Sequence, residues 1–515
     1  MSIVAGVDCG TQGTKVILVD LNTSTVLAEC SAPHELISQS NGRREQQPIW
    51  WIDAMVNAFE KAITAAKIDP KTIAAIGVSG QQHGLVALDS QGDVIRPAKL
   101  WCDTETAPEN AELLQMLGGE QACIDRLGLR VETGYTASKI LWMKNHEPEN
   151  FAKIAHILLP HDYLNFWLTG ELSAEYGDAS GTGLFNVRNR CWDEHVCSVI
   201  DPTGNLFKAL PALNSAEKPA GVVIGQAKER LGLNDNVVVS CGGGDNMMGA
   251  IGTGNVKNGI ITMSLGTSGT IYTFSDKPVE LKHPSIANFC SSSNGWMPLI
   301  CTMNVTSATS LVQDVLTMNL TEFNQSLEAS HIGAGNISFL QFFNGERVPA
   351  LPDGKASIHG LDAANFTRDN LVRSVVEGAT YGLKYGLELL RDAGINIEQI
   401  RLIGGGAKSG QWRQMIADTM NCEVICPEVE EAAALGAAIQ ASWALNGELG
   451  TGLIDQLIVL NEDSRTLPIS GNVEQYEMAY QRYMSTLFNQ YPQLNDSQLK
   501  EQQLNARQQV GSYDE

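Results

Sequence analysis

The sequence lacks several features that would indicate particular classes of protein. No apolar run in its 515 residues reaches the about 18–20 residues that cross a bilayer. The net charge is −23 and no basic run is longer than Arg43-Arg44, so a nucleic-acid partner, which needs clustered Lys and Arg, is not expected. The eleven cysteines are scattered and form no C-x-x-C pair, which argues against a zinc site or redox pair. This cysteine usage predicts a reducing, cytoplasmic location.

Two familiar nucleotide motifs are also missing. Neither a Walker A motif nor G-x-G-x-x-G occurs, which excludes P-loop and dinucleotide-binding interpretations. Instead, glycine turns follow predicted strands at Gly10–Thr14, Gly266–Gly269 and Gly404–Gly406. Turns of this kind direct N–H and O–H donors into one concavity, which suits a phosphate. The first two turns both spell G-T-x-G-T, a weak internal repeat that suggests two similar lobes facing each other.

A central stretch, VVVSCGGGDN, places a carboxylate after a triple glycine. Val237–Val239 predicts a short buried strand, and Gly242–Gly244 leaves a bare backbone before Asp245. Open α/β sheets bind ligands at the carboxyl ends of their strands, so Asp245 is a candidate reacting group. The alternative is that Asp245 only caps a helix.

The order of predicted elements indicates the type of sheet. Strands at Ile3–Asp8, Lys15–Asp20 and Val26–Ser31 precede a helix that opens at Pro48, and a strand at Ile73–Val78 follows. This β-β-β-α-β order predicts a mixed sheet rather than a strictly alternating one. Residues 100–235 have helical patterns and are expected to wall the substrate side of the first lobe. Later expected elements are a helix at Asn370–Arg391, a strand at Arg401–Ile403 and helices at Trp412–Met420 and Glu431–Leu445.

Several polar side chains follow these strands. Asp8 precedes the first glycine turn, where it could hold hydrated Mg²⁺ on phosphates or simply bond its own turn. The adjacent Gln82 and His83 form a hydroxyl-binding pair. Trp101 and Asp103 can face one polyol, although Trp101 could instead belong to the core. Arg130 and Lys139 are weaker candidate contacts, and nothing in the pattern promotes Glu45, Glu175 or Asp178.

Taken in order, these motifs resemble those of the FGGY carbohydrate kinases over roughly residues 3 to 445. The resemblance implies an α/β fold of two actin-like (ribonuclease H-like) ATPase lobes, each a mixed sheet flanked by helices. It implies an N-terminal lobe at 1–253 with the sugar site and first phosphate loop, and a nucleotide-binding C-terminal lobe at 254–494. The polar tail at 495–515 has no counterpart. The matching motifs are GVDCGTQGTK, QQHG, LWCDTET, GYTASKILWMKNH, LPHDYLNFWLTG, GDASGT, GGGDN, SLGTSGT, ASIHGLDAANFTRDNLVRSVVE and IGGGAKSGQWRQM.

The resemblance also implies roles for single residues. By position, Asp245 matches the catalytic base and Asp8 the residue near Mg²⁺. Gln82 and His83 match ketose-binding residues, with Asp245 and Asn246 completing that site. One departure is Gly410, where some relatives carry a polar residue that contacts the nucleotide. The remaining matches are Thr11, Gln12, Gly13 and Lys15 in the first phosphate loop, Gly266 and Thr267 in the second, and Gly405, Gly406 and Ser409 in the adenosine loop.

The function implied is phosphorylation of the terminal hydroxyl of a ketopentose by Mg-ATP, with D-xylulose giving its 5-phosphate. Within the same family, ribulose or a polyol is an alternative acceptor. An actin-like ATPase without a small-molecule acceptor, or a sugar-binding regulator, is an alternative of another class. The expected partners are the ketose and ATP, with a homodimer as a possible assembly and no nucleic acid or membrane.

Overall fold

A computed structural model describes residues 2–280 and 283–495. The predicted polar tail therefore lies, apart from Asn495, outside the described residues. The chain forms two compact units. Unit 1 consists of Met1–Ile261, Tyr272–Leu299 and Pro427–Leu460, and unit 2 consists of Thr262–Ile271, Ile300–Cys426 and Asn461–Glu515. The chain thus crosses between the two units at several points. The sequence predicted a single domain boundary between residues 253 and 254, and that boundary stays a prediction.

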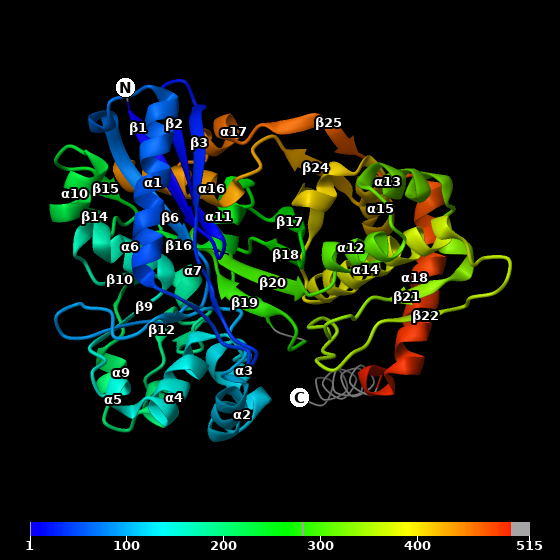
Figure 1. Cartoon of the computed structure of the whole chain (residues 1–515), viewed down its shortest axis with the longest axis horizontal. Coiled ribbons are helices and arrows are strands. Elements are labelled where there is room, and N and C mark those ends of the chain that lie inside the picture. Colours follow the sequence, from blue (N-terminus) through cyan, green and yellow to red (C-terminus); the bar gives the residue numbers. More distant parts are fainter. Residues whose placement is uncertain (1, 281–282, 496–515) are drawn as a thin grey trace, which may run out of the picture. The chain divides into compact units, whose positions relative to one another are not determined.

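The first sheet is mixed, as the element order predicted. Its strands lie in the order β14-β15-β6-β1-β2-β3, and β16 also pairs with β6 (Figure 1). Strand β1 runs antiparallel to β2 and parallel to β6. The apolar runs of β1, β2 and β6 are buried because both faces of the sheet are covered. The strands are β1 (Ile3–Cys9), β2 (Gly13–Asp20), β3 (Thr25–Pro33), β6 (Ile73–Gly80), β14 (Gly221–Val222), β15 (Val238–Val239) and β16 (Gly243–Gly244).

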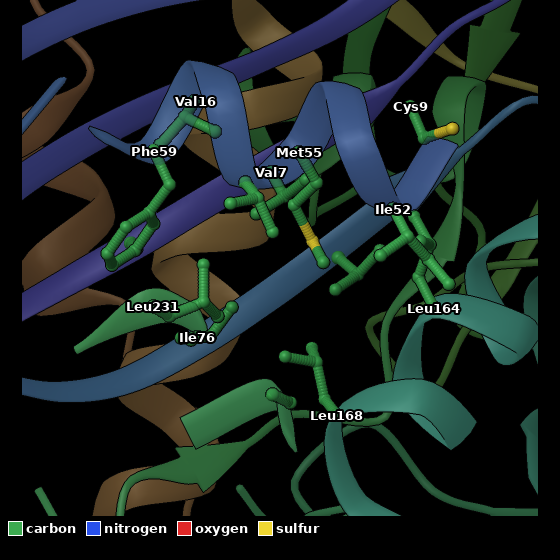
Figure 2. Packing of buried hydrophobic residues seen from close by; sticks show 14 of the residues in the cluster. Val7, Cys9, Val16, Ile52, Met55, Phe59, Ile76, Leu164, Leu168 and Leu231 are labelled. Atoms are coloured by element: carbon green, nitrogen blue, oxygen red, sulfur yellow. The ribbon is translucent and has the colours of Figure 1, made fainter. Parts of the chain in front are cut away.

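Helix α1 (Pro48–Ala66) covers one face of this sheet. It begins at a proline, whose fixed φ and missing N–H suit the first turn. Its apolar stripe packs on the strands, and Figure 2 shows Met55 and Phe59 of α1 beside Val7 and Val16 in one buried cluster. The prediction of a helix opening at Pro48 is confirmed.

Helix α16 (Ala432–Asn446) covers the other face and packs closely. A Cβ at Gly6 of β1 or at Gly77 of β6 would collide with carbonyl oxygens of α16. Helix α11 (Asp245–Gly252) also packs on α16, where a Cβ at Gly436 would collide with the carbonyl oxygen of Met248. Glycine therefore lets these backbones touch, and the contact fixes where α11 begins.

Residues 100–235 form the predicted helical segment and belong to unit 1. The helices are α2 (Ala107–Met116), α3 (Glu120–Leu127), α4 (Thr136–His146), α5 (Pro148–Phe151), α6 (Pro160–Thr169), α7 (Tyr176–Ala179), α8 (Glu194–Ile200), α9 (Asn205–Lys208) and α10 (Gly225–Leu231). The small strands of this region and of the preceding loops are β4 (Ile37–Ser38), β5 (Arg44–Gln46), β7 (Val86–Leu88), β8 (Ala98–Lys99), β9 (His156–Leu158), β10 (Ser173–Glu175), β11 (Phe185–Asn186), β12 (Cys191–Trp192) and β13 (Ala212–Asn214).

A second sheet has the strand order β19-β20-β18-β17-β23-β24-β25. Strands were predicted close to where β17, β18 and β23 are found, and the long predicted helix is α14. The predicted helix at Glu431–Leu445 is α16, which belongs to unit 1. The strands are β17 (Gly259–Leu265), β18 (Gly269–Thr273), β19 (Ala287–Cys290), β20 (Trp296–Thr302), β23 (Ile397–Ile403), β24 (Glu423–Pro427) and β25 (Leu460–Thr466), with the separate pair β21 (Ser338–Leu340) and β22 (Ser357–His359). The helices are α12 (Thr306–Val315), α13 (Leu320–Ala329), α14 (Arg368–Asp392), α15 (Gly410–Met420), α17 (Gly452–Leu457) and α18 (Ser470–Gln490), and short 3₁₀ turns lie at Pro70–Thr72, Ala334–Asn336 and Gly405–Lys408.

Within the described ranges, no helix combines the length and the apolar character needed to cross a membrane. All eleven cysteines are free thiols.

Candidate active site

Asp245 begins helix α11 immediately after strand β16. That strand pairs with the end of β6, with Gly243 beside Ser79 and Gly244 beside Gly80. The N-cap position is occupied by Gly244, so Asp245 is the first residue of the helix and not its cap. The preceding Gly242 has φ +77°, and a Cβ there would lie 2.7 Å from the Val78 carbonyl oxygen. The triple glycine is thus what allows the carboxylate to stand at this edge of the sheet.

The surroundings of Asp245 make its carboxyl group unusually basic. Burial raises its pKa to about 8, and the negative charges of Asp8 and Asp178 act in the same direction. The backbone N–H of Asn246 donates to Asp245 Oδ1 at 2.8 Å. A buried carboxyl group with a pKa near the working pH is suited to accept a proton.

The structure brings the amide groups of two predicted sugar-binding residues, Gln82 and Asn246, to this carboxyl. Asn246 Nδ2 donates to Gln82 Oε1 at 2.8 Å and lies 3.2 Å from Asp245 Oδ1. Gln82 is buried, and its Nε2 has no hydrogen-bond partner among the described residues. Since a buried amide N–H rarely stays without a partner, this donor is available for a hydroxyl oxygen.

His83 is held in an uncommon backbone conformation. Its φ is +62°, which costs free energy for a residue other than glycine. Its ring packs on Tyr135, with centroids 4.5 Å apart, and on Phe289 at 5.8 Å. Its carbonyl oxygen accepts from Lys139 Nζ at 2.9 Å and from Thr136 Oγ1 at 3.1 Å. The strained conformation therefore persists because several neighbours fix it.

The first glycine turn joins β1 and β2 as a hairpin, as predicted. The Gly10 N–H donates to the Gly13 carbonyl at 3.0 Å. Asp8 stands before this turn and accepts from Ser79 Oγ at 2.7 Å. Burial raises the pKa of Asp8, while Ser79 and Lys15 oppose the rise.

Lys15, opposite Asp8 in the hairpin register, forms an ion pair with Glu431. Glu431 is the residue that precedes helix α16. A lysine predicted to contact phosphate is thus already paired with a carboxylate in the chain without ligand.

Trp101 is linked to the same turn. Its indole Nε1 donates to Thr11 Oγ1 at 2.9 Å, and Thr11 Oγ1 donates to Gln81 Oε1 at 3.1 Å. The rest of the Trp101 side chain faces solvent, since the residue is 37% exposed. The alternative that Trp101 is a core residue is therefore wrong.

Asp103 lies in a buried ionic cluster. It accepts from the Arg44 N–H at 2.8 Å and from Lys99 Nζ at 3.1 Å. Oxygens of Glu45, Asp103 and Glu105 lie close enough to suggest a metal site, but the Lys99 amine contacts all three carboxylates. Arg96 also pairs with Glu45 and Arg43 with Glu105, so three cations balance the three carboxylates. A contact between Asp103 and a sugar stays a prediction.

Unit 2 brings its two glycine loops together. Strands β17 and β23 are neighbours, and a Cβ at Gly406 would lie 2.8 Å from Leu265 Cβ. Gly266 and Thr267 follow Leu265, and their carbonyl oxygens accept N–H groups at the start of α12. Ser409 caps α15 and donates to Asn324 Oδ1 at 2.9 Å. A Cβ at Gly405 would meet open space.

Three ionisable residues close to the candidate site were not promoted from the sequence. His161 is fully buried between Asp162 and Asp178, at 2.8 and 2.9 Å. Burial opposes its charge, but these two carboxylates raise its pKa well above the usual value. Burial raises the pKa of Asp178, while His161 and a hydrogen bond from the His83 backbone N–H oppose the rise. Its charge also raises the pKa of Asp245, so Asp178 lies near both His83 and Asp245. No local spacing could indicate this, because the residues meet only in the fold.

The two-unit α/β fold with mixed sheets is the actin-like ATPase fold of sugar kinases. The protein is an ATP-dependent carbohydrate kinase by class. The model of the FGGY family of carbohydrate kinases, N-terminal domain, matches residues 3–252, and that of the C-terminal domain matches residues 261–445. The chain belongs to the FGGY family of carbohydrate kinases.

Known relatives match nearly the whole chain. A xylulose kinase of Haemophilus influenzae is 53% identical over 94% of this chain and 99% of its own. One of Streptomyces coelicolor is 37% identical over 87% of this chain and 89% of its own. The crystal structure of xylulose kinase from Bifidobacterium adolescentis is 31% identical, with a TM-score of 0.80, and covers 93% of this chain and 99% of that one.

Proposed function

We propose that the protein transfers the γ-phosphate of ATP to the terminal hydroxyl of D-xylulose and releases D-xylulose 5-phosphate. The observation that carries the proposal is the half-buried carboxyl of Asp245, with its raised pKa, beside the amide groups of Gln82 and Asn246. Relatives described as xylulose kinases, one of them 53% identical, support the choice of sugar.

Asp245 is the proposed general base. Its carboxylate accepts the hydroxyl proton as the sugar oxygen attacks the γ-phosphorus and the bond to the β-phosphate oxygen breaks. The attack needs positioning and charge neutralisation more than a strong base, since phosphoryl transfer passes through a loose transition state. The pKa of about 8 means that an appreciable fraction of the carboxyl is ionised near neutral pH and that it readily takes the proton.

The sugar contacts are assigned to the same edge of the first sheet. Gln82 Nε2 is a buried donor with no partner in the described chain, so a ketose hydroxyl would satisfy it. The Asn246 amide joins Gln82 to Asp245, and His83 adds an imidazole ring fixed by Tyr135. Trp101 and Asp103 are retained as further candidate contacts.

The nucleotide contacts are assigned to turns rather than to a cationic patch. In unit 1, the turn of Thr11, Gln12 and Gly13 offers backbone N–H donors to phosphate oxygens, with Lys15 nearby. In unit 2, Gly266 and Thr267 form a second phosphate loop. The adenosine loop is formed by Gly405, Gly406 and Ser409.

Asp8 is the proposed residue near Mg²⁺. It is a half-buried carboxylate with one neutral donor, Ser79, on Oδ1. One carboxylate fits an ion that keeps most of its waters and is held chiefly by phosphates. Bound Mg²⁺ would supply charge neutralisation on the phosphate oxygens. The possible homodimer and the cytoplasmic location remain predictions from the sequence.

The test is ADP release measured with D-xylulose, D-ribulose, an aldopentose and glycerol. We expect kcat/KM for D-xylulose to exceed that for each other acceptor by about tenfold or more, since pocket contacts worth about 1.4 kcal/mol give that factor. Asp245→Asn should lower kcat by about two to four decades. A higher kcat/KM for another acceptor would overturn the choice of sugar, and near-normal turnover of Asp245→Asn would remove Asp245 from the role of base.

A further inference from the structure

Lys139 presents an unexplained arrangement in unit 1. The residue is fully buried in α4, and its amine donates to two backbone carbonyls, those of His83 and Gly134. Burial lowers the pKa of this amine to about 7, although the charge of Asp103 opposes the change. Burying an ammonium group costs free energy that two neutral carbonyls repay only in part. Packing alone therefore does not explain a buried lysine at this position.

Both carbonyls belong to segments that shape the proposed sugar site. His83 has φ +62°, and Gly134 has φ +97°. A Cβ at Gly134 would collide with the carbonyl oxygen of Trp101, so this turn rests directly on the backbone of Trp101. The following residue, Tyr135, packs its ring on that of His83. One amine therefore ties together two backbone segments, of which the one at His83 is held in a strained conformation.

We propose that Lys139 is a positioning residue of the sugar site, which acts through His83 and the Gly134–Tyr135 turn without touching the sugar. The side chain is fully buried and its amine already donates to the two carbonyls, so we assign it a role behind the sugar site rather than in contact with the sugar. The inference rests on the proposed role of His83 in binding the ketose. Thr136, which donates to the same His83 carbonyl at 3.1 Å, is the weaker member of this anchor.

The chain offers a matched control on the same helix. Lys144 of α4 also donates its amine to a backbone carbonyl, that of Ile200 at the end of α8, which is not among the proposed sugar residues. Lys144→Met and Lys139→Met remove the same chemistry from one helix. If the hydrogen bond from Lys139 to the His83 carbonyl positions the sugar site, only Lys139→Met should impair sugar binding.

We expect Lys139→Met to raise the KM for D-xylulose about tenfold or more, because a hydrogen bond from a charged group is worth about 1.5–3 kcal/mol. The KM for ATP should change less than about twofold. Lys144→Met should leave both values within about twofold of the wild type. Thr136→Val, which loses one hydroxyl, should raise the sugar KM by severalfold and keeps the test open if Lys139→Met does not fold.

A double-mutant cycle separates this inference from the proposed function. If Lys139 acts through His83, Lys139→Met should add little to the sugar KM of His83→Ala. Equal rises in the sugar KM of folded Lys139→Met and Lys144→Met, or full additivity with His83→Ala, would overturn the positioning role. If His83→Ala itself leaves the sugar KM unchanged, the proposed sugar site fails, whatever the lysine variants show.

Discussion

Asp245→Asn should make the ligand-free protein more stable while it removes activity. Burial, Asp8 and Asp178 raise the pKa of Asp245 from 3.8 to about 8. Above pH 3.8 the unfolded chain releases this proton, whereas the folded chain keeps it until about pH 8. The folded state therefore loses stability as the pH rises through this window. Asparagine keeps the oxygen that accepts the Asn246 N–H and cannot ionise in either state.

The size of the effect follows from the same pKa values. Each tenfold change in an ionisation constant is worth about 1.4 kcal/mol. The advantage of asparagine over aspartate should therefore be about 1.5 kcal/mol near pH 5 and should grow to about 5 kcal/mol near pH 8, as an upper limit. The sign is opposite to that of a carboxylate in a favourable ion pair, whose loss costs most at neutral pH.

The assay is thermal and urea unfolding of both proteins, without nucleotide or sugar, from about pH 5 to pH 8. The control is Asp235→Asn, because Asp235 is exposed and its pKa is lowered by Lys228, so this variant should gain nothing as the pH rises. A difference between Asp245→Asn and the wild type that stays constant over this range would refute the reasoning, because it would mean that Asp245 ionises in the folded protein as it does in the unfolded chain.

Two further predictions concern the framework of the site. Gly436→Ala places a methyl group against the Met248 carbonyl and should cost about 1–3 kcal/mol of stability, which calorimetry would show as a lower Tm; kcat should also fall because α11 carries Asp245. Gly450→Ala, where a Cβ meets open space, is the control. An equal Tm for the two variants would contradict the close-packing argument. Trp101→Phe loses the hydrogen bond to Thr11 Oγ1 and should raise the KM for sugar and the KM for ATP severalfold in steady-state kinetics. A change in the sugar KM alone would show that this hydrogen bond does not link the two sites.

Local signals in the sequence located much of the site. The G-T-x-G-T turn between β1 and β2, the proline at the start of α1 and the triple glycine before Asp245 each act within a few residues, and each is found as predicted. The neighbouring pair Gln82 and His83 was also visible, because both follow a strong apolar strand. Short-range sterics determine these features, so a pattern of residue types is enough to find them.

The remaining features depend on contacts between distant segments. Gly77 and Gly436 look like ordinary small residues until α16 is seen packed against β6 and α11. The prediction placed the α16 segment in the second lobe because it follows that lobe in sequence, whereas Pro427–Leu460 packs with unit 1. Lys139 appeared as a weak sugar contact, although its amine points at backbone carbonyls. No spacing rule reports which carbonyl a lysine will meet.

The charges around Asp8 explain how so acidic a chain can bind a nucleotide. Lys15, the basic residue of the first hairpin, is paired with Glu431, and Asp8 and Asp245 add negative charge nearby. A phosphate that relied on Lys15 alone would compete with that carboxylate. Backbone N–H groups of the turn carry no net charge and do not compete with that carboxylate. Anion binding at this hairpin therefore depends on the geometry of the turn. For this reason Gly10 and Gly13 indicate a phosphate site even though the chain has no basic patch there.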